Sequence, residues 1–320
     1  MIVSLLLIAG TLKAQFDPQL GHYMYMPSSF NPAAAGEGEL MKVSATHRMQ
    51  FTGIEGAPMS TYFTLTSAFH IGKTRHGAGL RVLNDMYGLW KNQTFCAQYA
   101  YRQKIGKGYL GIGIELGLVN IIFTGDSVNL GDMEAAGSEI HIGSDPAIPV
   151  SESSGMQFDM GAGLYYSTSR WFAGLSYSHI LQPRVELINQ SGSTNEKISM
   201  RVRGTFYATG AYKFKIRNSD FALQPSAMLM TDFASWNLDL TLMTEFKERY
   251  RWGLSYRVLD GVGLLLGMEI ISGLELGYNY ELPTSKLLLE SYGNHEIYLS
   301  YGFNIIRPKR TNKYKSVRFL

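Results

Sequence analysis

The sequence contains a single cysteine, Cys96, among its 320 residues. A disulfide framework, a CxxC redox pair and a cysteine-based zinc site are therefore excluded, because each needs at least two thiols. Charged residues are scarce, at 17% against about a quarter in ordinary globular proteins, and the net charge of +3 is too small to indicate nucleic-acid binding. Beyond the N-terminus no run of about 18 apolar residues occurs, which excludes a helical membrane protein.

Glycine and tyrosine are abundant instead, with 34 and 20 residues. From about residue 38 onward, apolar and polar residues alternate with a period of two, which is typical of half-buried strands. The clearest run is Leu274 to Leu282, where leucine and tyrosine alternate with glutamate, glycine and asparagine. About 14 such runs lie near 39–50, 59–71, 76–86, 92–105, 108–123, 156–166, 171–180, 201–214, 221–233, 236–246, 250–257, 261–271, 274–282 and 295–305.

Two features favour a membrane barrel over the alternative, a soluble sandwich. Charged residues stand in the middle of the polar faces, where a dry sandwich core would not tolerate them unpaired. They are Arg81, Glu115, Asp159, Asp239, Glu269 and Glu275. Aromatic residues end many apolar faces, as in the interfacial girdles of outer-membrane barrels. They are Tyr87, Trp90, Tyr109, Phe123, Trp171, Phe233, Trp236, Phe246 and Trp252.

The lengths of the links between strands predict the orientation. Every second link is short, at 72–75, 106–107, 167–170, 215–220, 247–249 and 272–273, whereas the other set includes 125–155, 181–200 and 283–294. Outer-membrane barrels have short periplasmic turns and longer outer loops. The sequence therefore predicts an all-β fold, a transmembrane antiparallel up-and-down β-barrel of about 14 strands over 38–306, in the outer membrane with both termini periplasmic.

The N-terminal part of the chain does not alternate. Ile2 to Ala9 is apolar and small residues surround Ala14, which predicts a signal peptide at 1–14; a buried first strand is the alternative. Residues 15–37 form an N-terminal non-barrel segment that is too apolar for a free tail. We expect this segment to pack against the inner wall or the periplasmic rim of the barrel, with a linker as the alternative.

Residues 307–320 form a basic tail that we expect on the periplasmic side. It contains no acidic residue and six cations: Arg307, Lys309, Arg310, Lys313, Lys315 and Arg318. Such a charge run is a candidate docking site for an acidic partner. A solvated tail and an attraction to acidic lipid headgroups are the alternatives.

The sequence offers little catalytic chemistry. Gly111, Gly113 and Gly117 read GxGxxxG inside one strand, whereas a dinucleotide loop must leave a strand and open a helix. Small residues that relieve crowding in a barrel wall explain them better. No histidine lies in a nucleophile motif, so we expect no enzyme, no catalytic residue, no cofactor and no metal site.

Several stretches are similar to one family. QFDPQLGHYMYMPSSFNPAAAG, HRMQFTGIEGAPMSTYFTLTSAF, GAGLRVLNDMYG, LELGYNYEL and HEIYLSYGF resemble the PorP/SprF outer-membrane proteins of Bacteroidetes. The resemblance implies a 14-strand barrel of the type IX secretion and gliding machinery, without catalytic residues. The family-motif positions, which we expect to be structural, are Asn31, Pro32, Gly36, Arg48, Pro58, Asp85, His295 and Glu296.

The functional expectation is an interaction protein that anchors or assists export of other proteins. The partners that the resemblance implies are a periplasmic lipoprotein and ring assembly, or a dedicated large secreted surface protein; the bilayer is a further partner and nucleic acid is not. The alternative is a passive channel or transporter for small or apolar solutes, with residues 15–36 as its plug. The sequence leaves open whether the chain is a core component or a cargo-dedicated paralogue.

Overall fold

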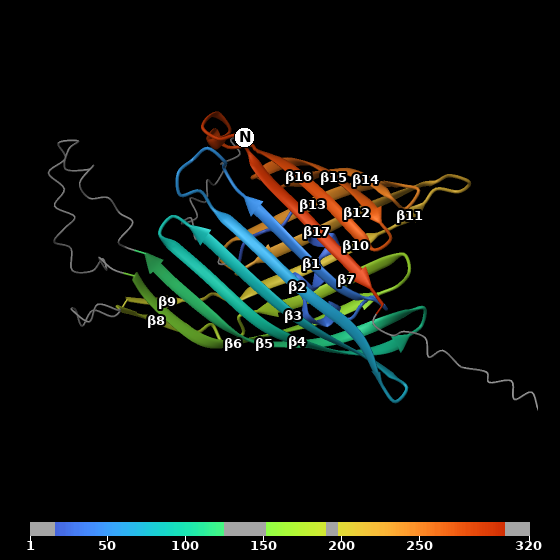
Figure 1. Cartoon of the computed structure of the whole chain (residues 1–320), viewed down its shortest axis with the longest axis horizontal. Helices are drawn as coiled ribbons and strands as arrows, with labels where there is room; N and C mark the ends of the chain where they lie inside the picture. The colour runs from blue at the N-terminus through green and yellow to red at the C-terminus, as the bar shows by residue number, and fades with distance from the viewer. Residues whose placement is uncertain (1–16, 125–151, 190–197, 305–320) are drawn as a thin grey trace, which may run out of the picture.

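Antiparallel strands form a closed barrel in the computed structural model, which describes residues 17–124, 152–189 and 198–304. Strand β1 pairs with β2 on one side and with β17 on the other, so the ring has no open edge. Each remaining barrel strand pairs with the next barrel strand along the chain, and β7 pairs with β10 across an inserted hairpin. The predicted all-β, up-and-down barrel of about 14 strands is confirmed (Figure 1).

The strands lie within a few residues of their predicted positions. In chain order they are β1 (Met41–Met49), β2 (Met59–Ile71), β3 (Thr74–Tyr87), β4 (Trp90–Ile105), β5 (Gly108–Thr124), β6 (Glu152–Ser167), β7 (Trp171–Ser178), β8 (Arg184–Asn189), β9 (Ile198–Arg201), β10 (Thr205–Tyr212), β11 (Phe214–Lys215), β12 (Phe221–Thr231), β13 (Trp236–Phe246), β14 (Tyr250–Arg257), β15 (Gly261–Ile271), β16 (Leu274–Pro283) and β17 (Asn294–Phe303). Strand β11 is a two-residue pairing with β12, and β8 and β9 lie outside the ring of 14.

The two ends of the barrel differ in their links. One end, called the short-turn end, carries the links 72–73, 106–107, 168–170, 216–220, 247–249 and 272–273. The other, called the long-link end, carries 50–58, 125–151, 179–204 and 284–293 among its connections, the last with the 3-10 turn η6 (Lys286–Leu289). Within the described residues, no helix is long and apolar enough to cross a membrane.

The link predicted at 181–200 contains structure of its own. Strands β8 and β9 form a hairpin there, and β8 also pairs with the start of β6. Apolar side chains of this hairpin pack against the inward face of β5, on Val119, Ile121 and Phe123. The assignment of Phe123 to an outer aromatic girdle is therefore wrong, because the odd-numbered positions of β5 face inward and the hairpin covers them. The girdle assignment is also wrong for Tyr109, at another odd position of β5, and for Trp90, which packs against the same inward cluster.

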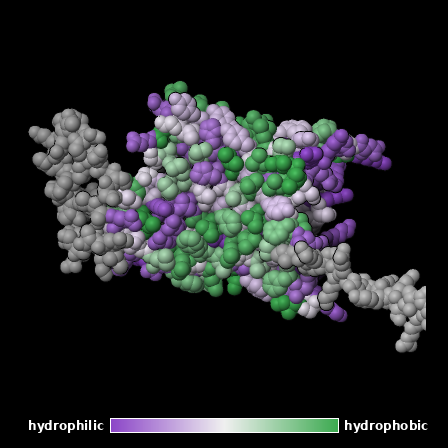
Figure 2. Space-filling view, viewed as in Figure 1, coloured by the Kyte–Doolittle hydropathy of each residue, from purple (hydrophilic) through white to green (hydrophobic). Residues whose placement is uncertain are grey.

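The two faces of the wall have opposite character. Outward side chains such as Ile112, Leu264 and Leu276 are exposed and apolar, and apolar residues gather around the middle of the visible surface (Figure 2). Inward side chains are polar and buried, as for Arg81 and Glu115, whose atoms lie 2.8 Å apart. This outward-apolar, inward-polar alternation is that of a transmembrane barrel, and such a barrel is consistent with the outer membrane.

Residues 17–37, called the inner segment, lie inside the ring of strands (Figure 1). They form three short 3-10 turns, η1 (Tyr23–Tyr25), η2 (Pro27–Ser29) and η3 (Pro32–Ala34). Proline opens η2 and η3, where its fixed φ suits the first position and its missing N–H costs nothing. Turns of this kind rarely run beyond a few residues, so the segment consists of successive short turns rather than one helix.

Candidate functional site

The inner segment crosses the lumen from the long-link end to the short-turn end. Near its start, Tyr62 Oη donates to Pro18 O at 2.9 Å from a position close to the long-link end of β2. Near its finish, Arg75 donates to the carbonyl oxygens of Gly36, Glu37 and Gly38 at 3.1, 2.7 and 2.6 Å, beside the β2–β3 turn. The segment then enters β1 at the short-turn end.

A buried cluster holds the start of the segment. His179, just beyond β7, lies between Asp17 at 3.0 Å and Asp159, and Tyr207 Oη donates to Asp17 at 2.5 Å. Burial alone would raise the pKa of Asp17, but the charge and hydrogen bond of His179 lower it to about 2. Burial alone would lower the pKa of His179, but the Asp17 charge and the bond to Asp159 raise it to about 10. The pair is therefore ionised over the whole neutral range.

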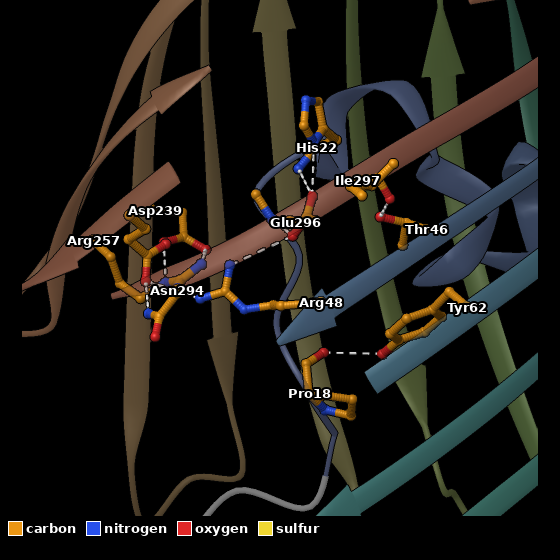
Figure 3. A network of polar contacts seen from close by, with 12 residues as sticks. Pro18, His22, Thr46, Arg48, Tyr62, Asp239, Arg257, Asn294, Glu296 and Ile297 are labelled. Atoms are coloured by element: carbon orange, nitrogen blue, oxygen red, sulfur yellow. Dashed lines mark hydrogen bonds and ion pairs between the residues drawn. The ribbon is translucent and has the colours of Figure 1, made fainter. Parts of the chain in front are cut away.

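A second cluster holds residues 21 and 22 (Figure 3). The carboxylate of Glu296 on β17 accepts the backbone N–H groups of Gly21 and His22 at 2.7 and 2.9 Å, and His22 Nδ1 lies 2.7 Å from it. Arg48 on β1 reaches the same carboxylate at 3.4 Å and Glu281 at 2.8 Å. Arg48 is the register partner of Glu296, so pairing of the first and last strands assembles this cluster.

The ion pairs continue along the wall away from the segment. Arg257 on β14 contacts Glu281 at 2.8 Å and Asp239 at 2.7 Å. Asn294 Nδ2 donates to the same Glu281 oxygen at 2.7 Å. All four side chains are almost fully buried, and charges in such surroundings are tolerated because each has its partners.

Side chains of the wall also bind the backbone of the segment over its middle and end. Donors from β1, β4 and β7 approach its carbonyl oxygens, and each bond satisfies a group that the 3-10 turns leave unpaired. The bonds are Lys42 Nζ to Tyr25 O at 3.0 Å, Gln98 Nε2 to Ser28 O at 2.9 Å, Ser176 Oγ to Phe30 O at 2.7 Å and Arg102 to Ala33 O at 3.2 Å. In the opposite sense, Asn31 Nδ2 donates to Leu164 O at 2.9 Å and to Leu175 O at 3.2 Å.

Glycines in the wall make room for the segment. A Cβ at Gly113 would lie 2.2 Å from Ala33 N, and one at Gly77 would lie 1.9 Å from Ala35 O. Because these neighbours are backbone atoms, they cannot give way by a rotamer change. The sequence predicted small residues that relieve crowding at Gly111 and Gly113; the crowding partner is η3, which no sequence pattern identified.

Most family-motif residues of the N-terminal half hold backbone in place. Asn31 caps η3 by accepting the Ala33 N–H at 3.0 Å, and Pro32 opens that turn. Gly36 has φ +66° and packs on the backbone of the β2–β3 hairpin. Pro58 O accepts the Gln50 N–H in the β1–β2 link at 2.9 Å.

The remaining motif residues fall in different places. Arg48 and Glu296 come together in the cluster beneath residues 21 and 22. Asp85 is buried near the long-link end, where Ser60 Oγ donates to it at 2.6 Å. His295 belongs instead to the other face, where it contacts Tyr278 Oη at 2.6 Å. The six tail cations, Arg307 to Arg318, and the signal peptide at 1–14 lie outside the described residues, so these remain predictions.

The sequence interpretation missed the polar contacts that join the inner segment to the wall. Asp17, His22 and His179 look like isolated polar residues in the sequence, and the only available signal was the presence of ionisable residues in apolar surroundings. Within the described part of the chain, no group of three His, Cys, Asp or Glu side chains could hold a metal ion. The arrangement binds the peptide backbone of the inner segment.

Several solved structures have a similar fold. The Ralstonia pickettii toluene transporter TbuX has 11% identity and a TM-score of 0.45, with 86% of this chain and 92% of that chain covered. The Acinetobacter baumannii outer membrane protein Omp33 has 8% identity and a TM-score of 0.46, with 84% and 99% covered. With such low values, these similarities say nothing about what this chain binds.

Sequence comparison is more specific. No curated protein matches the chain significantly. The family model described as "Type IX secretion system membrane protein PorP/SprF" matches residues 12–301, which includes the inner segment and almost the whole barrel. The resemblance that the motifs indicated is confirmed, and the chain belongs to the PorP/SprF family of type IX secretion system membrane proteins.

Proposed function

We propose that this protein is a non-enzymatic outer-membrane barrel that anchors partner proteins of the type IX secretion and gliding machinery, or assists their export. Its partners in this proposal are other secretion components, such as a periplasmic lipoprotein and ring, or one dedicated large surface protein. Family membership supports the assignment to type IX secretion. Within the proposal, the short-turn end and the C-terminal tail face the periplasm.

The single observation that supports an anchor over a channel is that contacts with the wall hold the inner segment along its whole length. Buried charge clusters hold its start, wall side chains bind its backbone, and glycines fit its turns closely. A plug that leaves the lumen during transport would have to break all these contacts together. The proposal therefore treats the segment as a permanent filling that makes the barrel a rigid platform.

The long-link end supports a protein contact at the outer surface. Two of its links, 258–260 and 284–293, carry large apolar side chains that face solvent, with Leu259, Leu289 and Tyr292 exposed by 83%, 85% and 77%. Exposed apolar side chains that lie together commonly mark interaction sites. We expect a cell-surface partner to contact this end.

Conductance separates the anchor from the passive channel, which is the alternative function. The purified full-length protein in a planar bilayer should show no stable ion conductance, because the segment fills the lumen. Steady ohmic steps at neutral pH would contradict the anchor and favour the channel.

Co-purification tests which proteins bind this barrel. The tagged protein, cross-linked in whole cells, should bring down other secretion components or a large surface protein. The variant Leu289→Asp should lose a surface partner, whereas Glu248→Lys at the opposite end should retain it. Equal recovery with both variants would show that the long-link end is not the contact site.

The position of the termini belongs to the same proposal. Phe303 ends β17 at the short-turn end, whereas Asp17 lies toward the long-link end. Residues 1–16 and 305–320 lie outside the described residues, so the periplasmic location of both termini stays a prediction. A cysteine at Leu289 should react with an impermeant reagent in whole cells and one at Asn218 should not; the reverse would invert the orientation.

A further inference from the structure

A cavity of about 420 Å³ opens between the inner segment and the wall at the short-turn end. This volume falls within the range of natural ligand pockets, about 300–1,000 Å³. Its lining combines apolar groups of the segment, including Met24 and Met26, and the side chain of Leu40 just before β1, with hydroxyl groups from β1, β2 and β17. The cavity is thus built jointly by the segment and the barrel, and it exists only when the segment is seated.

Acidic groups outnumber basic ones in the lining. Glu37, Glu39 and Glu275 face it, against the single cation Lys42. Lys42 Nζ is committed to the carbonyl oxygen of Tyr25 at 3.0 Å, and Glu275 is held by Arg251 at 2.9 Å from outside the lining. Glu39 is exposed at the rim.

Glu37 is one of the two partly buried carboxylates of the lining. Tyr165 Oη donates to it at 3.1 Å. Burial raises the pKa of Glu37, and the nearby charge of Arg102 only partly opposes this. A cation that enters the cavity would offset this cost of burial, because an opposite charge within about 4–6 Å favours the ionised form of the carboxyl group.

The chain itself supplies a matching ligand beside this cavity. Gly302, near the end of β17, lines the cavity, and the sequence continues from there into the tail with six cations and no acid, ending in Val317, Arg318, Phe319 and Leu320. A fully extended stretch of residues 305–320 reaches roughly 50 Å, far more than the distance to the rim. The tail therefore offers both the charge and the apolar groups that the lining complements.

We propose that this cavity binds the basic C-terminal tail of the same chain, residues 307–320, through Glu37, Glu39 and Glu275. A tether of this length gives an effective concentration on the order of millimolar, so even a weak contact is substantially occupied. Because exposed charge pairs are screened by salt, occupancy falls as ionic strength rises. The tail then has a site on its own barrel, whichever partner the barrel anchors.

Disulfide trapping in the full-length protein tests this site. In a Cys96→Ala background, Leu40→Cys at the cavity rim is combined with Thr311→Cys in the tail, and disulfide formation is followed by mass spectrometry at low salt. The matched control pairs Thr311→Cys with Asn218→Cys, which lies at the same end on the β11–β12 link. We expect the rim pair to form at least five-fold faster than the control pair.

Charge variants then separate specific binding from random encounter. Glu39→Lys in the rim pair should slow trapping about five-fold to ten-fold, whereas Glu248→Lys, an exposed carboxylate at the same end, should leave the rate unchanged. Each protein must first show heat-modifiable mobility, which reports a folded barrel. Equal trapping at both cysteine positions, or equal effects of both charge changes, would overturn the proposal. Loss of rim trapping in vesicles with acidic lipids, but not in neutral vesicles, would overturn it in favour of the headgroups.

Discussion

Removing the carboxylate of Glu296 should release the start of the inner segment while the barrel stays inserted. This carboxylate accepts two backbone N–H groups and lies against His22 Nδ1, all within 2.9 Å. It also carries part of the charge that balances Arg48. In Glu296→Ala these donors remain buried without their acceptor.

The expected loss of stability follows from this geometry. A hydrogen bond to a charged group contributes about 1.5–3 kcal/mol, and breaking a buried ion pair from one side costs about 3–5 kcal/mol. These terms overlap because they describe the same atoms, so we expect about 3–5 kcal/mol in total. Glu281 still balances Arg48 at 2.8 Å, which keeps the loss from exceeding this range.

Urea unfolding in detergent micelles, followed by tryptophan fluorescence, measures the loss directly. Chymotrypsin gives a second readout, since Tyr23, Tyr25 and Phe30 are protected only while the segment is seated. The matched control is Glu248→Ala, which removes a carboxylate whose pairing with Lys215 is fully exposed to solvent and should cost nothing measurable. If Glu296→Ala has the same urea midpoint and the same resistance to chymotrypsin as Glu248→Ala, this cluster does not hold the inner segment.

Three further predictions follow from the same structure. The His179–Asp17 pair should stabilise the fold fully between about pH 4 and about pH 6.5. That contribution is lost as pH rises toward about 10, and the Asp17 part is lost as pH falls from about 4 to about 2; a urea midpoint that does not decrease from pH 7 to pH 10 would refute this. Gly113→Ala should cost about 1–3 kcal/mol by overpacking against the segment, whereas Gly210→Ala, with 3.5 Å of clearance, should be neutral; equal unfolding midpoints would contradict the close fit. Leu266→Arg, in the middle of β15 and facing outward, should cost about 2–4 kcal/mol and impair membrane assembly, while Leu266→Met should not; normal heat-modifiable yield of the arginine variant would show that the faces are reversed.

The sequence predicted the barrel because its signals are local. Successive side chains of a strand point to opposite faces, so the alternation in 274–282 marks β16 and its lipid-facing leucines without any knowledge of neighbours. The alternation of short and long links can also be read directly from the sequence. The strand order follows when each strand is paired with the next one along the chain. The same dependence on local signals explains the wrong assignment of Phe123 at the end of β5. Phe123 is an aromatic residue at a strand end, and nothing nearby in the sequence reveals the hairpin that covers it.

The candidate site was predictable only in part. The motif indicated Arg48 and Glu296 as important, and composition indicated that residues 15–37 pack against the barrel. Neither showed that Glu296 binds residues 21 and 22, which stand more than 270 positions earlier in the chain. Nor did the spacing of Gly111 and Gly113 reveal which backbone presses on them.

What the sequence by itself determined is therefore the wall: the number of strands, their faces and the alternation of their links. What only the tertiary structure decided is the filling: the path of the inner segment, its direction from the long-link end to the short-turn end, and the partners of Asp17 and Glu296. The reason is physical. Strand alternation is imposed residue by residue by the contrast between lipid and lumen, whereas the contacts of the filling come into being only when β1 meets β17 and the barrel closes around it.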